Sequence, residues 1–256
     1  MNWIDTHAHI YAESFQADLD QVLQEARELG VSRIYMPNID VESIDLMLEV
    51  EQKYSEQCIA TMGLHPCHVD KDFEKQLYIM EDWLSKRPFV AVGEIGTDLY
   101  WDKTYFEQQK EAFNIQANWA KKYQIPIIIH CRESIDENIE LVAALKDERL
   151  TGVFHCFSGD LDQAKKIIDL GFMLGIGGVA TFKNGGLDKV LTHIDPKHIV
   201  LETDSPYLAP TPHRGKRNSP AYIPLIARRV SELMSISEEE IANITTLNAL
   251  RLFKAK

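Results

Sequence analysis

The chain has 256 residues, 45% of them hydrophobic and 26% charged, which is the composition of a globular protein that can bury a full core. Its 39 acidic and 27 basic residues give a net charge of −12, which argues against indiscriminate binding to nucleic acid. No apolar run is long enough to cross a bilayer and the N-terminus lacks the pattern of a secretion signal, so we expect a soluble cytoplasmic protein without a membrane partner.

The chain opens with a short apolar run, Trp3-Ile4, which predicts a strand and leads into Asp5-Thr6-His7-Ala8-His9. Side chains two positions apart in a strand point to the same face, so His7 and His9 can present two imidazoles side by side. Two neutral imidazoles in this arrangement provide half of a metal site. A single pair of this kind is more often a pair of surface histidines, so its meaning depends on what the rest of the chain supplies.

Seven further apolar runs predict strands, which brings the total to eight. They lie at residues 34–36, 59–62, 90–92, 127–129, 153–154, 172–174 and 199–201. Between them are amphipathic helical stretches, the clearest at residues 19–29, 106–120 and 226–234. Gly30 is placed to end the first of these helices, and Ser237 with Glu240 forms a capping pattern for a final helix.

The regular alternation of eight strands with helices predicts a closed parallel (β/α)8 barrel, or TIM barrel, formed by residues 1–256 as one domain. The alternative is an open, doubly wound sheet. Such a sheet normally carries a glycine-rich turn after its first strand, where this chain has His7-Ala8-His9. The predicted fold class is therefore α/β, with the functional site at the C-terminal ends of the barrel strands.

Six of the eight predicted strands end in a His, Glu or Asp residue, which scattered polar residues would not do so consistently. These strand ends carry His7 and His9, His65, Glu94, His130, His155, and Glu202 with Asp204. Two divalent cations can be held by four of these histidines and two carboxylates. The histidines are His7, His9, His130 and His155, and the carboxylates are Glu94 and Asp204. Glu94 lies in the middle of the set and is the natural bridge between them. Two such cations can stabilise both the attacking and the leaving oxygen of a displacement.

Basic residues gather in a loop rich in Pro and Gly after the eighth predicted strand. Arg214, Lys216 and Arg217 would lie there beside the cations and suit phosphate oxygens, because Arg can bind a phosphate with two parallel hydrogen bonds. Arg132 and His65, at the ends of two other strands, are further candidates for contact with phosphate.

The ordered strand-end motifs resemble the TatD family of metal-dependent deoxyribonucleases, within the amidohydrolase superfamily of barrels. The resemblance runs from residue 5 to Asn248, almost the whole chain. The motifs that carry it are Asp5-Thr6-His7-Ala8-His9, Gly63-Leu64-His65-Pro66, Gly93-Glu94-Ile95-Gly96, Ile129-His130-Cys131-Arg132, His155-Cys156-Phe157-Ser158-Gly159, Glu202-Thr203-Asp204-Ser205-Pro206-Tyr207-Leu208-Ala209-Pro210 and Pro212-His213-Arg214-Gly215-Lys216-Arg217-Asn218.

The resemblance implies two divalent cations per chain, which Glu94 bridges. One would be held by His7, His9, Glu94 and Asp204, and the other by Glu94, His130 and His155. Asp204 would also accept a proton from the metal-activated water. Glu202 is implied to act close to the catalytic centre, and an equally good interpretation is a carboxylate that orients a metal-binding histidine. His213 joins the candidate substrate contacts. Ligand softness suits zinc, nickel, cobalt or iron and phosphodiester chemistry suits magnesium or manganese, so the metal stays open.

The chain departs from the family pattern after Gly96, where Thr97-Asp98-Leu99-Tyr100 replaces the usual Leu-Asp-Tyr sequence. We expect this change to affect the pocket beside Glu94, and therefore substrate preference more than metal binding. Tyr100 and Trp101 follow at once and suit stacking with an unpaired base, although packing at the rim explains them equally well.

The resemblance implies a metal-dependent hydrolase that cleaves DNA phosphodiester bonds, as a 3′–5′ exonuclease acting on single-stranded or frayed ends. One alternative keeps the site and changes the bond: an amidohydrolase-type esterase or deacylase, such as a D-aminoacyl-tRNA deacylase. Another is a metal-loaded barrel that binds nucleic acid without catalysis. The expected partner is a DNA substrate, with RNA or tRNA as further possibilities, and no obligate protein partner is implied.

Overall fold

The structure is a computed structural model that describes residues 1–254, and eight parallel strands form the barrel wall in that part of the chain. The strands are β1 (Trp3–Asp5), β2 (Val31–Pro37), β3 (Cys58–Thr61), β4 (Val92–Asp98), β5 (Ile127–Arg132), β6 (Gly152–Phe154), β7 (Met173–Ile176) and β8 (Ile199–Leu201).

Regular ladders join the strands into two parallel sheets, β1-β2-β3 and β4-β5-β6-β7-β8. Single bridges connect the sheets at both seams, Met62 with Val92 and Ala8 with Ser205. Backbone hydrogen bonds support both seams, from the N–H of Gly93 to the carbonyl of Met62 at 3.0 Å and from the N–H of Thr6 to the carbonyl of Leu201 at 3.0 Å. The predicted closed (β/α)8 barrel is confirmed.

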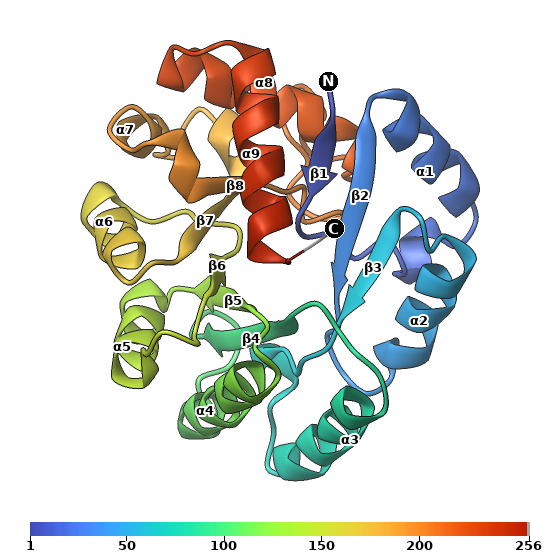
Figure 1. Ribbon diagram of the computed structural model, residues 1–256, viewed down its shortest axis with the longest axis vertical. Coiled ribbons are helices and arrows are strands. Elements are labelled where there is room, and N and C mark those ends of the chain that lie inside the picture. Colours follow the sequence, from blue (N-terminus) through green and yellow to red (C-terminus); the bar gives the residue numbers. More distant parts are fainter. Residues whose placement is uncertain (255–256) are drawn as a thin grey trace.

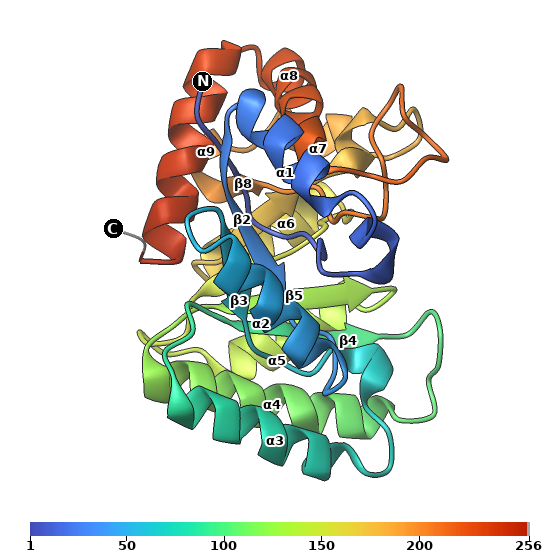
Figure 2. The same ribbon diagram turned by 90° about the vertical axis from the view of Figure 1, so that its right-hand side faces the viewer.

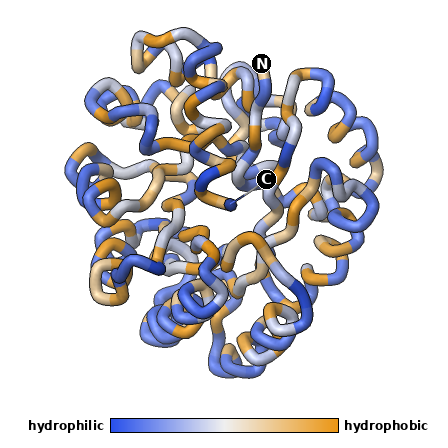
Figure 3. The backbone as a smooth tube through the Cα atoms, in the orientation of Figure 1, coloured by the Kyte–Doolittle hydropathy of each residue, from blue (hydrophilic) through white to orange (hydrophobic). Residues whose placement is uncertain are grey.

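Helices surround the strands (Figure 1). They are α1 (Leu19–Glu28), α2 (Ser43–Lys53), α3 (Phe73–Lys86), α4 (Phe106–Tyr123), α5 (Ile135–Leu145), α6 (Leu161–Asp169), α7 (Asp188–Leu191), α8 (Ile223–Met234) and α9 (Glu238–Leu252). Hydrophilic residues are concentrated on the outer helices, as expected for amphipathic helices that pack on a buried sheet (Figure 3). Within residues 1–254, no helix combines the length and apolar character needed to cross a membrane.

Two predicted helix boundaries are confirmed. Gly30 follows α1 with φ of +89°, a left-handed conformation that glycine adopts without strain, and a Cβ there would lie 2.4 Å from the carbonyl oxygen of Met1. The Ser237 side chain accepts a hydrogen bond from the N–H of Glu240, and the Glu240 carboxylate accepts one from the N–H of Ser237, which completes a capping box at the start of α9.

Helix α9 covers the N-terminal end of the barrel. Its buried end residues, Leu252 and Phe253, join a small core with Ile4 and Ile128 inside the barrel, and the Phe253 ring stacks on Tyr35 with centroids 3.9 Å apart. Figure 2 shows α9 on one side of the barrel and the long loop between β8 and α8 on the opposite side. With one end closed by α9, the C-terminal mouth of the strands is the end left for a functional site.

The fourth and fifth strands differ from their predictions. An apolar run at residues 90–92 predicted β4 to end before Glu94, but β4 is Val92–Asp98 and Glu94 lies within it. All seven of its residues are buried, including three polar ones, so an apolar pattern cannot mark its extent. Gly93 allows close packing of the next strand, because a Cβ there would lie 2.6 Å from Cβ of Ile128. Strand β5 likewise continues past residue 129 through His130 to Arg132.

Candidate metal centre

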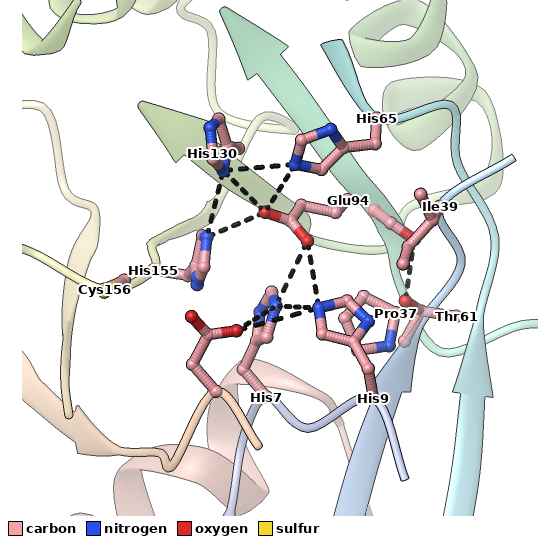
Figure 4. A network of polar contacts seen from close by, with 12 residues as sticks. His7, His9, Pro37, Ile39, Thr61, His65, Glu94, His130, His155 and Cys156 are labelled. Atoms are coloured by element: carbon pink, nitrogen blue, oxygen red, sulfur yellow. Dashed lines mark hydrogen bonds and ion pairs between the residues drawn. The ribbon is translucent and has the colours of Figure 1, made fainter. Parts of the chain in front are cut away.

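The carboxylate of Glu94 lies at the centre of a histidine cluster, and its two oxygens face different rings (Figure 4). Oε2 lies 3.2 Å from Nε2 of His7 and 3.5 Å from Nε2 of His9. Oε1 lies 2.7 Å from Nε2 of His155 and 2.9 Å from Nδ1 of His130. The carboxylate therefore divides the cluster into two half-sites and belongs to both.

Asp204 joins the half-site of His7 and His9. Its Oδ1 lies 3.7 Å from Nε2 of both histidines. The residue follows β8 with φ of +58°, and its backbone N–H donates to the carbonyl of His7 at 2.8 Å, which ties the loop after β8 to the end of β1. Strand ends that are far apart in sequence thus bring together the predicted ligands of the first half-site.

The donor atoms fit divalent cations. The Nε2 atoms of His7 and His9 are 3.2 Å apart, and two nitrogens on one ion, each at about 2.1 Å from it, are separated by about 3.0–3.4 Å in octahedral or tetrahedral geometry. Among residues 1–254, three groups of possible ligands have all their donor atoms within 4.8 Å of one another. These groups are His7 with His9 and Glu94, His7 with His155 and Asp204, and His65 with Glu94 and His130.

A tyrosine sets the protonation of His9. The Tyr11 hydroxyl donates to the carbonyl of Pro37 at 2.6 Å, so its oxygen is left to accept a hydrogen bond from Nδ1 of His9 at 3.0 Å. With its proton on Nδ1, neutral His9 directs the lone pair of Nε2 toward Glu94 and Asp204, as a metal ligand must.

Asp98 sets the protonation of His130 in the same way but on the other nitrogen. Nε2 of His130 lies 2.9 Å from Oδ2 of Asp98, which can only accept a hydrogen bond when it is ionised. Without a cation, burial lowers the pKa of His130, but its hydrogen bonds to Asp98 and Glu94 outweigh burial and raise it. When the ring gives up a proton to a cation, Asp98 keeps the remaining proton on Nε2, and the lone pair is left on Nδ1, which faces Glu94. His130 is thus oriented for metal binding through Nδ1, and sequence reasoning did not assign this orienting role to Asp98.

Glu202 lies behind His155 and outside the ring of donor atoms. It is fully buried, its Oε1 accepts from the backbone N–H of Cys156 at 2.5 Å, and the same oxygen lies 3.4 Å from Nδ1 of His155. This position fits the carboxylate that orients a metal-binding histidine. The contacts of Oε1 favour this orienting role, and the catalytic role predicted for Glu202 stays a prediction.

His65 approaches the cluster as a hydrogen-bond donor. Its Nδ1 accepts from the backbone N–H of Cys67 at 3.1 Å, so the proton of the neutral ring sits on Nε2. That nitrogen lies 3.4 Å from Oε1 of Glu94 and 3.3 Å from Nδ1 of His130. A protonated Nε2 does not ligate a cation, but it can donate to an oxygen of a bound substrate, in agreement with the predicted phosphate contact.

Burial and mutual attraction shift the titration of the cluster. Burial opposes the negative charge of Glu94, but His155 and His7 outweigh it and hold its pKa well below the usual value. Burial lowers the pKa of His9 to about 4, so this ring is neutral at physiological pH. Burial alone would lower the pKa of His155, but Glu94 raises it well above its usual value. Burial raises the pKa of Asp204 to about 7.

Apart from the fully buried His7, the cluster lines a cavity of about 1560 Å³ at the C-terminal mouth of the barrel. Beyond the cluster, Trp101, Arg132 and Tyr207 contribute to its wall. Arg132 is therefore placed where the sequence predicted a substrate contact.

The four residues predicted to bind substrate from the loop after β8 do not line this cavity. Arg217 forms two hydrogen bonds with Asp18, at 2.9 and 2.5 Å, and its charge is already paired. The guanidinium carbon of Arg214 lies 3.6 Å from the centroid of the Phe182 ring, and His213 stacks on the ring of Tyr222. Lys216 is exposed. Sequence position after β8 does not fix the direction in which the loop turns, and the substrate contacts expected of these four residues stay a prediction.

Thr97 is one of the residues that depart from the family pattern, and it lies buried outside the wall of the cavity. Its side chain is fully buried, its hydroxyl accepts from the amide of Asn138 at 2.7 Å, and its carbonyl accepts from the hydroxyl of Ser134 at 2.8 Å. The residue joins β4 to α5 and does not line the cavity. Thr97 itself therefore does not shape the cavity, whereas Asp98 lines it and acts through His130. The effect that the departure from the family pattern has on substrate preference stays a prediction.

A (β/α)8 barrel that presents a carboxylate between two groups of histidines at its C-terminal mouth is the architecture of a metal-dependent hydrolase. Comparison with known proteins gives the family. The model of TatD related DNase matches residues 4–254, and the chain belongs to this family.

Relatives agree in sequence and in structure. The metal-dependent hydrolase YabD of Bacillus subtilis is 37% identical, and the match covers 98% of both chains. The 3′-5′ ssDNA/RNA exonuclease TatD of Pectobacterium parmentieri is 29% identical over 98% of both chains. The crystal structure of YjjV, a TatD homologue from Escherichia coli, superposes with a TM-score of 0.93 at 32% identity, covering 99% of this chain and 98% of that one.

Proposed function

We propose that this protein is a two-cation deoxyribonuclease that removes nucleotides from the 3′ end of single-stranded or frayed DNA. The observation that carries the proposal is the division of Glu94 between two half-sites, each with its own histidines. A pair of adjacent cations is the arrangement that suits in-line displacement at phosphorus. The TatD relative in Pectobacterium, named as a 3′-5′ ssDNA/RNA exonuclease, supports the same reaction and extends it to RNA.

Each residue of the cluster then has a defined task. His7, His9 and Asp204 would hold one cation and His130 with His155 the other, and Glu94 would be available to both. Such cations would supply Lewis-acid chemistry, which lowers the pKa of a water and offsets negative charge on the leaving oxygen. Asp204, which lies beside the first half-site, accepts the proton from the attacking water.

Two further groups bind the substrate. His65 donates from Nε2 to a phosphate oxygen at the second half-site, since its other nitrogen already accepts from Cys67. Arg132 lies on the cavity wall two residues after His130 and contributes the positive charge that a phosphate requires.

The test uses purified protein, 5′-labelled single-stranded DNA and a panel of divalent metals, with elemental analysis of bound metal. Metal-dependent shortening of the strand from its 3′ end is expected, and the Glu94→Gln variant should lose both the activity and the two cations. The exposed residue His193 does not line the cavity, so His193→Ala is the matched control. Intact DNA under every metal, or full activity in Glu94→Gln, would overturn the proposal.

The half-sites are tested separately. His9→Ala should lower occupancy of the cation near Asp204 more than that of its neighbour, and His130→Ala should do the reverse. Equal loss of both cations in each variant would mean that the cluster is one shared site. Metal content measured with and without chelator resolves the two outcomes.

One observation favours a second candidate, an ester of an aminoacyl-tRNA. The cavity wall beyond the cluster contains four acidic residues, Glu133, Asp136, Glu137 and Asp160, which suit the ammonium group of an aminoacyl ester, a group that DNA lacks. This candidate predicts release of amino acid from charged tRNA, including a D-aminoacyl-tRNA, while single-stranded DNA stays intact. Incubation of the same metal-loaded protein with both substrates distinguishes the two functions.

A further inference from the structure

Two exposed aromatic rings stand beside the metal centre on the loop that follows β4. The side chain of Trp101 is 69% exposed and that of Tyr100 is 48% exposed, and their rings meet edge to face with centroids 4.9 Å apart. The guanidinium of Arg132 lies 3.9 Å from the centroid of Tyr100 and 5.3 Å from that of Trp101. We refer to Tyr100, Trp101 and Arg132 as the aromatic platform.

The metal centre fixes the position of the platform. Oδ1 of Asp98 accepts hydrogen bonds from the backbone N–H groups of Tyr100 and Trp101, at 2.9 and 3.1 Å. Oδ2 of the same carboxylate accepts one from Nε2 of His130. Asp98 also pairs with Arg132 in the β4–β5 ladder, and the N–H of Leu99 donates to the carbonyl of Arg132 at 2.9 Å. A single carboxylate thus orients both a predicted metal ligand and the loop that carries the two rings.

The exposed ring of Trp101 borders the cavity and leaves a surface for a planar ligand. Trp101 and Arg132 line the cavity, whereas Tyr100 lies outside its wall and packs against Arg132. Indole and guanidinium groups are both surfaces on which nucleobases stack, and the guanidinium adds charge for a neighbouring phosphate. Few contacts bury Trp101, so it contributes little to the core.

We propose that the aromatic platform is a stacking subsite for one unpaired nucleobase of the substrate strand. This inference rests on the proposed function and adds the reason for strand selectivity. Bases inside a duplex are covered on both faces by their neighbours, so only an unpaired or frayed end can offer a face to Trp101. The platform then holds that base while the adjacent phosphate lies over the cations.

The kinetic test compares two single-stranded oligonucleotides, one complete and one with abasic residues at its 3′ end, on the metal-loaded enzyme. Trp101→Ala should lower kcat/KM on the complete strand by roughly 5- to 100-fold, which corresponds to the loss of one base–aromatic stack. The kcat/KM on the abasic strand should stay the same in this variant. Trp101→Phe should restore most of the loss, because a phenyl ring still stacks. Tyr78→Ala, which removes a 74% exposed ring on α3, is the matched control.

A binding test needs no turnover. Titration of the metal-loaded protein with dAMP should quench tryptophan fluorescence, whereas deoxyribose 5-phosphate should not, and the quenching should disappear in Trp101→Phe. Quenching without hydrolysis of DNA would retain the subsite and refute the proposed nuclease function. Equal kcat/KM for the two strands in both the wild type and Trp101→Ala, without quenching by dAMP, would refute the subsite while leaving nuclease activity in place.

Discussion

Asp98 and His130 are joined by a hydrogen bond of 2.9 Å that determines which nitrogen of His130 faces the metal centre. Because the ionised carboxylate accepts from Nε2, a neutral His130 directs the lone pair of Nδ1 toward Glu94, whose oxygen is 2.9 Å away. An orienting carboxylate behind a metal-binding histidine fixes the ring and raises its basicity. Asp98 therefore contributes to the second half-site without contacting a cation.

The Asp98→Asn variant should weaken the second half-site. Its amide oxygen can still accept from the two loop N–H groups, but the amide nitrogen then faces Nε2 of His130 and donates to it. The proton of His130 must move to Nδ1, which removes the lone pair needed for the cation. We expect metal affinity to fall by about 10- to 100-fold at this half-site.

Calorimetric titration with Mn²⁺ measures this change, with Asp102→Asn as the control on the same loop. Asp102 is exposed and accepts from the N–H of Thr104, away from the histidines. Unchanged affinity in Asp98→Asn would show that the orientation of His130 does not depend on Asp98.

The Arg217→Ala variant should keep its activity. The guanidinium is paired with Asp18 at the protein surface, where the two side chains are 35% and 37% exposed, so little positive charge is left for a substrate. Removal of this pair should cost no more than about 1 kcal/mol in the free energy of unfolding. Arg132→Ala, in contrast, should raise KM for DNA, because Arg132 lines the cavity.

Steady-state kinetics and urea denaturation of both variants check these expectations. Asp18→Ala should show the same small loss of stability as Arg217→Ala, and the double variant should add little. A large rise in KM for Arg217→Ala would mean that the loop turns toward the substrate when DNA binds.

The barrel and the members of the cluster could be predicted because they follow from one regularity. Parallel strands place their C-terminal ends together, so His7, His9, His130 and His155 must converge if each ends or follows a strand. Glu94 was identified in the same way, although β4 extends past it. The polar residues inside β4 conceal its length from any pattern of apolar residues.

The groups that orient the ligands could not be predicted, because they depend on hydrogen bonds between separate elements. Tyr11 and Asp98 become partners of histidines only when loops and strand registers are fixed in space. The surroundings of the basic loop could not be predicted for a related reason. Its sequence indicates positive charge, but the pairing of Arg217 with Asp18 joins residues at opposite ends of the chain.

Metal affinity should rise with pH around neutrality. In the metal-free protein, burial raises the pKa of Asp204 to about 7, and the charges of Glu94 and Glu202 hold the pKa of His155 above its usual value against the effect of burial. Below these pKa values both groups retain protons that a cation must displace. We therefore expect the affinity to fall by at least about tenfold per pH unit below pH 7.

Titration of metal-free protein with Mn²⁺ in two buffers of different ionisation enthalpy measures the released protons directly. Asp204→Asn, which cannot release a carboxyl proton, should show fewer released protons and a shallower dependence on pH. An affinity that is the same at about pH 6 and pH 8 would contradict the expectation.

The free energy of unfolding should fall in alkali because of the buried thiol of Cys58. This side chain has no exposed surface at the start of β3, and burial raises its pKa to about 12. An unfolded cysteine titrates near pH 8.5, so the unfolded chain releases a proton that the native protein retains. The stabilising contribution is complete below about pH 8.5 and is lost as pH rises toward 12, by at most about 1.4 kcal/mol per pH unit.

Urea denaturation under reducing conditions at about pH 7, 9 and 10 tests this contribution. The Cys58→Ala variant is expected to be less stable at neutral pH, since a buried sulfur is lost, but its stability should decline less between pH 9 and 10. Ile44→Val is the matched control, because it truncates a buried side chain that does not titrate and should lower stability by the same amount at every pH. If Cys58→Ala and Ile44→Val show parallel pH profiles, the thiol of Cys58 does not contribute to the loss of stability in alkali.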